Sequence, residues 1–76
     1  MTDKAREELE AFGWIVDYYP DRKNKWFVGL GSHGDSAPTL RKAIKRCLRC
    51  CKIGKTWPER RAQALEIMNK YLGGYK

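Results

Sequence analysis

The chain has 76 residues, a formal net charge of +7, and three Trp, four Tyr and two Phe. This size suits a single domain over residues 1–76, whose aromatic side chains supply a core that needs no metal or disulfide. No apolar run approaches about 18 residues and the N-terminal residues are charged, which excludes a membrane-spanning helix and predicts no secretory leader.

The first predicted element is a short helix over residues 3–11. These residues are strong helix formers that follow a polar N-cap and place carboxylates in the first turns. We expect a thin apolar side made of Ala5, Leu9 and Phe12. Gly13 tolerates the left-handed conformation and is expected to end the helix.

A β-hairpin is predicted next, because residues 14–19 and 25–30 alternate between two faces and the five residues between them have turn composition. The face expected against the helices carries Trp14, Val16, Tyr18, Trp26, Val28 and Leu30. On the other face we expect Ile15, Tyr19 and Phe27, partly covered by another element or by a partner.

Residues 29–38 are small and polar and predict a loop. A helix is predicted from Thr39 to the glycine at position 54, because apolar residues recur at i, i+3, i+4, i+7, i+8 and i+11. That spacing makes one buried stripe, composed of Leu40, Ala43, Ile44, Cys47, Leu48 and Cys51.

The opposite side of this helix is entirely cationic. Its six basic residues, with no carboxylate between Asp35 and Glu59, are Arg41, Lys42, Lys45, Arg46, Arg49 and Lys52. Like charges at i,i+4 cost about a few tenths of a kcal/mol each, so an ordinary solvated face would mix its signs. Two interpretations remain: solubility charge, and a docking surface for an acidic protein, a ribonucleoprotein, or DNA or RNA. We favour the docking surface.

A final helix is expected from the capping-box residues 56–59 to about residue 72. Its expected buried residues are Trp57, Ala64, Leu65, Met68, Tyr71 and Leu72. The predicted fold is therefore α+β with the order α-β-β-α-α: a helix, a two-stranded antiparallel hairpin and two helices packed on it. A two-stranded sheet is marginal and has two open edges, so a homodimer with a four-stranded sheet is the alternative to a monomer.

Two sequence patterns have the residue types of catalytic or nucleotide sites, and neither supports an enzyme. Gly29–Gly34 matches G-x-G-x-x-G, but the dinucleotide fold needs a second parallel strand after the helix, and here another helix follows. An anion held by backbone N–H groups near residues 36–40 stays open. Ser32, His33 and Asp35 are sequence neighbours, whereas a hydrolytic triad draws its members from separate elements. We therefore predict that the protein is not an enzyme and that it uses no cofactor.

The cysteines and two aromatic residues are further candidates for ligand binding. Cys47, Cys50 and Cys51 lie mid-helix, whereas zinc sites draw a C-x2-C pair from a turn, so we predict no metal site and leave oxidation of Cys50 open. Tyr19 and Phe27 would stack on the bases of a single-stranded nucleic acid if exposed, although core or interface roles are favoured.

Three strings of residues match a family pattern: Gly13-Trp14-x-Val16-x-Tyr18, Trp26-x-Val28-x-Leu30, and Gly34-Asp35-x-x-Pro38-Thr39-Leu40-x-x-Ala43-Ile44-x-Arg46. In these strings the chain resembles the small phage-encoded proteins called phage ABA-sandwich domains, over residues 13–48. The resemblance implies a helix–hairpin–helix fold and a phage or prophage origin, in a family with no established activity. Lys45 stands where such proteins often carry a cysteine, and the final helix is an addition.

Two functional hypotheses follow. The first is a non-catalytic phage accessory protein that binds a host macromolecular complex through its basic helix face, as anti-CRISPR inhibitors do. The alternative is a nucleic-acid-binding protein that uses the same face on phosphates. The expected partners are an acidic host protein or ribonucleoprotein, or DNA or RNA, and no membrane. Clustered free cysteines suit the reducing cytoplasm of a bacterial host cell.

Overall fold

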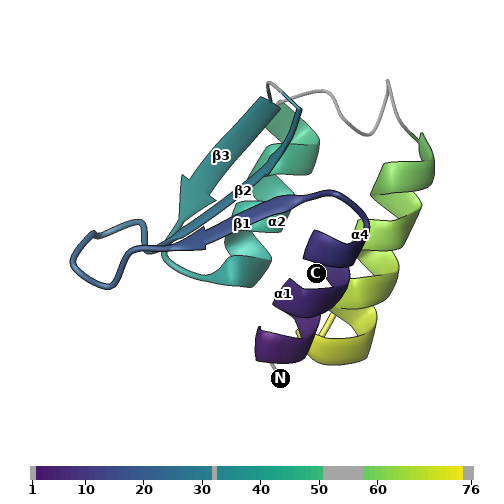
Figure 1. Cartoon of the computed structure of the whole chain (residues 1–76), viewed down its shortest axis with the longest axis horizontal. Coiled ribbons are helices and arrows are strands. Elements are labelled where there is room, and N and C mark those ends of the chain that lie inside the picture. Colours follow the sequence, from purple (N-terminus) through teal and green to yellow (C-terminus); the bar gives the residue numbers. More distant parts are fainter. Residues whose placement is uncertain (1, 32, 51–57, 75–76) are drawn as a thin grey trace.

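The computed structural model of the protein describes residues 2–31, 33–50 and 58–74, which form three α-helices and one three-stranded sheet (Figure 1). The helices span Thr2–Ala11 (α1), Leu40–Cys50 (α2) and Pro58–Tyr71 (α4). The strands span Ile15–Tyr18 (β1), Trp26–Leu30 (β2) and His33–Ala37 (β3). The predicted α+β class is confirmed, and the predicted order of elements lacked one strand.

Gly13 ends α1 as the sequence predicts. Its φ of +93° lies in the left-handed region, its N–H donates to the Glu10 carbonyl, and the N–H of Trp14 donates to the Leu9 carbonyl. This pair of bonds is a Schellman motif, which satisfies carbonyls that the helix end leaves open. The prediction for Phe12 was wrong: its side chain is 40% exposed, because the helix stops at Ala11 and Phe12 leaves the apolar stripe.

Replacing Gly13 with alanine is expected to lower the free energy of unfolding by about 1 kcal/mol, since an L side chain is disfavoured at positive φ. A Cβ at this position meets nothing within 4 Å, so the cost is a backbone cost alone. Thermal unfolding followed by circular dichroism should show a melting temperature lower by about 4–8 °C. Gly13→Asn should lose less than Gly13→Ala, because asparagine tolerates this conformation better. Equal losses for the two variants would contradict the backbone explanation.

The sheet has the strand order β1-β2-β3, and both pairs of neighbours are antiparallel. β3 corrects the sequence prediction, which made residues 29–38 a loop and the sheet two-stranded. Its residues, His33 to Ala37, have low strand propensity, but the register against β2 (Phe27 opposite Ser36, Val28 opposite Asp35) supplies backbone pairing that overrides it. Two copies paired at their sheet edges would therefore share six strands, not the four that the homodimer alternative assumed.

The glycine string Gly29–Gly34 is part of the β2–β3 hairpin and does not lead into a helix. Gly29 lies in β2, Gly34 lies opposite it in β3, and Gly31, with a φ of +65°, lies in the turn between them. This antiparallel context is not the strand–turn–helix unit of a dinucleotide site.

α2 lies against one face of the sheet, over β2 and β3, while α1 and α4 lie side by side next to it (Figure 1). The buried residues of the core are Ala5, Leu9, Trp14, Val16, Val28, Leu30, Ala37, Leu40, Ala43, Ile44, Cys47, Leu48, Ala64, Ile67 and Met68. Predicted burial is thus confirmed for Trp14, Val16, Val28 and Leu30, and Trp26 is half-buried. Tyr18 was wrongly placed: it is 45% exposed at the end of the edge strand, where its ring contacts that of Trp26.

The packing of α4 follows the prediction in most positions. Ala64 and Met68 are fully buried, while Leu65, Tyr71 and Leu72 are partly buried and pack against the core. An ion pair of 3.7 Å joins Lys70 Nζ to Glu8 on α1. Tyr71 and Glu8 together raise the pKa of the exposed Lys70 above its ordinary value, because both favour the charged ammonium.

Several predictions fall outside the described residues: the capping box at residues 56–59 in part, the burial of Trp57, and the positions of Cys51 and Lys52. The side chain of Cys50 is likewise not described. None of the helices in the described residues combines the length and the apolar composition of a membrane span.

Candidate functional site

α2 has the two faces that its sequence predicts. Leu40, Ala43, Ile44, Cys47 and Leu48 are all buried against the sheet and the neighbouring helix. Thr39 precedes the first residue of α2 as its N-cap: its Oγ1 accepts a hydrogen bond of 3.2 Å from the Lys42 N–H. The remaining side of α2, away from the buried stripe, carries five basic residues, which we call the α2 basic face: Arg41, Lys42, Lys45, Arg46 and Arg49.

The members of the α2 basic face differ in exposure. Lys42, Arg46 and Arg49 are exposed, whereas Arg41 and Lys45 are half-buried. The prediction of six cations on one open side is therefore met by three of the five described residues, and Lys52 lies outside the described chain. Of the exposed three, Arg46 lies on the flank next to β3, where it contacts Ser36.

Two arginines of this face bind backbone carbonyl groups. The Arg41 Nε donates to the Gly74 carbonyl at 2.6 Å, which ties the end of the chain after α4 to α2. On the other flank, Arg46 Nη1 donates to the Ser36 carbonyl of β3 at 3.0 Å. A neutral carbonyl does not cancel a guanidinium charge, so Arg46 stays both cationic and exposed.

The acidic N-terminal helix does not neutralise these charges. α1 packs against α4 and β1, and its carboxylates Glu10 and Glu8 pair with Arg6 and Lys70. In the described residues no carboxylate oxygen lies within 4 Å of the charged groups of Lys42, Arg46 or Arg49. The positive charges of these three side chains are therefore not cancelled by a neighbouring carboxylate.

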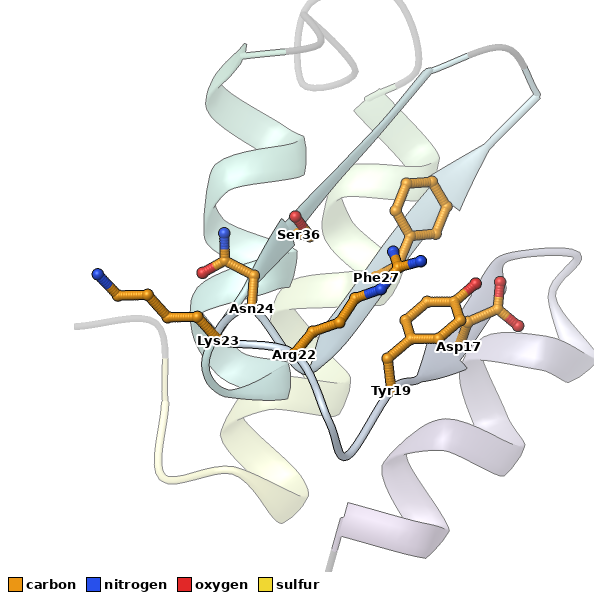
Figure 2. A pocket seen from close by; sticks show the side chains of 7 residues that line it. All are labelled: Asp17, Tyr19, Arg22, Lys23, Asn24, Phe27 and Ser36. Atoms are coloured by element: carbon orange, nitrogen blue, oxygen red, sulfur yellow. The ribbon is translucent and has the colours of Figure 1, made fainter.

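A cavity of about 590 Å³ lies on the sheet face opposite the helices, and we call it the open-face pocket (Figure 2). It is lined by Asp17, Tyr19, Arg22, Lys23, Asn24, Phe27 and Ser36. Asp17, Phe27 and Ser36 form one row across the three strands, because Phe27 is the register partner of both others. Arg22, Lys23 and Asn24 come from the β1–β2 connection, which borders the row (Figure 2).

Tyr19 and Phe27, the predicted stacking residues, both line this pocket. Tyr19 is 38% exposed, and the Arg22 guanidinium lies 4.5 Å from the centre of its ring, within the range of a cation–π contact. Phe27 is half-buried, since its ring lies over Gly34, where a Cβ would collide with it. At Gly29 a Cβ would press on both the ring and the His33 carbonyl oxygen. The absence of a side chain at these two positions thus leaves the space that the Phe27 ring occupies.

The open-face pocket and the α2 basic face meet at Ser36. Its side chain lines the pocket, while its carbonyl accepts the hydrogen bond from Arg46. Sequence reasoning missed Asp17, Arg22, Lys23, Asn24 and Ser36 as pocket residues. The cation–aromatic composition of residues 19–27 was the available signal, but the pocket requires β3, which the sequence did not predict.

The described residues of the remaining sequence patterns lie in β3 and α2. His33 is exposed in β3, and the Asp35 Oδ1 accepts a hydrogen bond from the Ser36 N–H at 2.8 Å, as in a local turn-like contact. Ser32 lies outside the described residues. No group of three metal-binding side chains comes together in the described ranges, and Cys47 is fully buried.

Comparisons of the chain with protein-family models, curated proteins and solved structures find no match. The resemblance to phage ABA-sandwich domains therefore stays a prediction from the quoted residues.

Proposed function

We propose that this protein binds single-stranded nucleic acid, without catalysing a reaction, through the combined α2 basic face and open-face pocket. The contact between Arg46 and Ser36 carries the proposal, because it makes the cationic helix side and the aromatic pocket one surface. Proteins that bind single strands combine a positively charged track with aromatic rings on which bases stack. Both parts are present here, in Lys42, Arg46 and Arg49 and in Tyr19 and Phe27.

The test is the salt dependence of binding to a fluorescein-labelled 12-nucleotide single strand, measured by fluorescence anisotropy. Contacts from Lys42, Arg46 and Arg49 alone give a slope of log K against log salt of about −2, and Arg22 and Lys23 bring it to about −3.5. Affinity should then fall about 15- to 130-fold between roughly 50 and 200 mM salt. Absence of any binding at 50 mM salt would refute the proposal. A neutral polymer of similar length is the control.

A second candidate function is docking onto a host protein complex, as the resemblance to phage proteins implies. The observation that favours it is a set of exposed apolar side chains on or beside β1, namely Phe12, Ile15, Tyr18 and Tyr19. Exposed apolar side chains suit a protein partner, and the α2 basic face would add attraction to an acidic one, such as a defence or transcription complex. Pull-down from bacterial lysate, with and without nuclease, separates the two functions: capture that survives nuclease treatment favours the protein partner.

A further inference from the structure

We propose that the open-face pocket holds one nucleotide, with its base on Tyr19 and Phe27 and its phosphate on Arg22 and Lys23. The inference rests on the proposed function and identifies the place where one nucleotide of the strand would bind. A free mononucleotide and one nucleotide within a strand present the same base and phosphate groups. The experiment below distinguishes these two sources.

The size and charge of the cavity suit this ligand. Its volume of about 590 Å³ lies within the range of about 300–1,000 Å³ that small-molecule sites occupy. Two cations, Arg22 and Lys23, border it against one carboxylate, Asp17. In the described chain neither cation has a carboxylate oxygen within 4 Å, so their charges are available to a phosphate.

The polar side chains in the row across the sheet are also open to a ligand. In the described part of the structure, the Asp17 carboxylate, the Asn24 amide and the Ser36 hydroxyl make no hydrogen bond to another protein group. A carboxylate accepts hydrogen bonds from the amino group of a base, and an amide both donates and accepts. Asp17 also repels a phosphate, which leaves the phosphate to the connection. Figure 2 shows the Arg22 guanidinium near the Tyr19 and Phe27 rings and the Lys23 side chain extending away from them, so Arg22 is the first phosphate contact and Lys23 the outer one.

The aromatic residues supply the stacking surfaces. The Phe27 ring lies where a Cβ at Gly34 would stand. Tyr19 lines the same cavity beside Arg22 (Figure 2). A base stacked here would replace water at Phe27, and at Tyr19 it would displace the Arg22 guanidinium or use the ring face that Arg22 leaves open. The strand could leave past Ser36 toward Arg46, Lys42 and Arg49, which continue the cationic track on α2.

The experiment is an NMR titration of ¹⁵N-labelled protein with guanosine and uridine 5′-monophosphates, with inorganic phosphate as the anion control. The mononucleotides are expected to shift the amide signals of residues 17–27 and of Ser36, while phosphate shifts only those near Arg22 and Lys23. The carboxylate of Asp17 predicts larger shifts with the guanosine nucleotide, whose base presents an amino group. Identical shifts from phosphate alone would overturn the nucleotide site in favour of an anion site.

Matched variants complete the test with the labelled 12-nucleotide strand. Tyr19→Ser is expected to weaken binding about tenfold through lost stacking, whereas Tyr18→Ser, an exposed neighbour outside the pocket, should change it less than twofold. Lys23→Glu should weaken binding more than Lys25→Glu, which makes the same charge change on an exposed residue outside the pocket.

The two proposals fail in different ways. If Tyr19→Ser and Lys23→Glu bind the strand as the wild type does and no mononucleotide shifts the pocket amides, the pocket is not a nucleotide site, while strand binding through α2 stands. If mononucleotides shift the pocket amides but no strand binds at 50 mM salt, the site takes free nucleotides and the proposed strand-binding function is overturned.

Discussion

The double variant Lys42→Glu, Arg49→Glu is expected to bind the single-stranded 12-mer about 100-fold more weakly than the wild type at about 50 mM salt. Each single-strand phosphate contact gains about eightfold in affinity when salt falls from about 1 M to 50 mM, and the variant loses two such contacts. Repulsion by the two new carboxylates adds to the loss. The slope of log K against log salt should become shallower by about 1.4.

The fold should survive these changes, because both side chains are exposed on α2 and neither has an ion pair or hydrogen bond from its charged group within the described residues. Circular dichroism and the melting temperature check this point. Glutamate at these positions also relieves like-charge contacts along the helix, so a modest gain in stability is compatible with the prediction.

A matched control separates local charge from total charge. Lys4→Glu, Arg61→Glu changes two exposed cations on α1 and α4, and each of the two double variants lowers the net charge from +7 to +3. The control is expected to weaken binding less than fivefold, through the reduced general field alone. Equal losses in both double variants would show that α2 is not the binding face.

The second large effect concerns stability. Ile44→Ala is expected to lower the free energy of unfolding by about 3 kcal/mol. The Ile44 side chain is fully buried where α2 packs on the sheet, so its truncation leaves a cavity. A domain of this size is stable by only about 4–11 kcal/mol, so this is a large share of the total. The melting temperature should fall by about 12–24 °C.

Two variants bracket that result. Ile44→Val removes a single methyl group and should cost about 1 kcal/mol. Ile15→Ala removes the same atoms as Ile44→Ala from a side chain that is 47% exposed on the edge strand, and should cost no more than about 0.5 kcal/mol. A loss at Ile15 as large as that at Ile44 would mean that the β1 surface is buried in solution, for example against a second copy of the chain.

The sequence supported the site only in part. It identified Tyr19 and Phe27 as stacking candidates and all the α2 cations, because residue type is enough to nominate a ring or a charge. It favoured core or interface roles for the two rings, since exposure depends on what covers the sheet. Among the described residues no helix covers that face, and both rings line one pocket.

What the sequence determined by itself was the amphipathic helix over residues 40–50 and the helix end at Gly13, because helical periodicity and left-handed φ are properties of neighbouring residues. Tertiary structure alone decided β3, whose small polar residues become a strand only through backbone pairing with β2. It also decided which cations stay available: Arg41 turns to the Gly74 carbonyl, while Arg46 reaches Ser36 and joins the helix to the pocket. Such contacts link residues distant in the chain, and no local pattern specifies them.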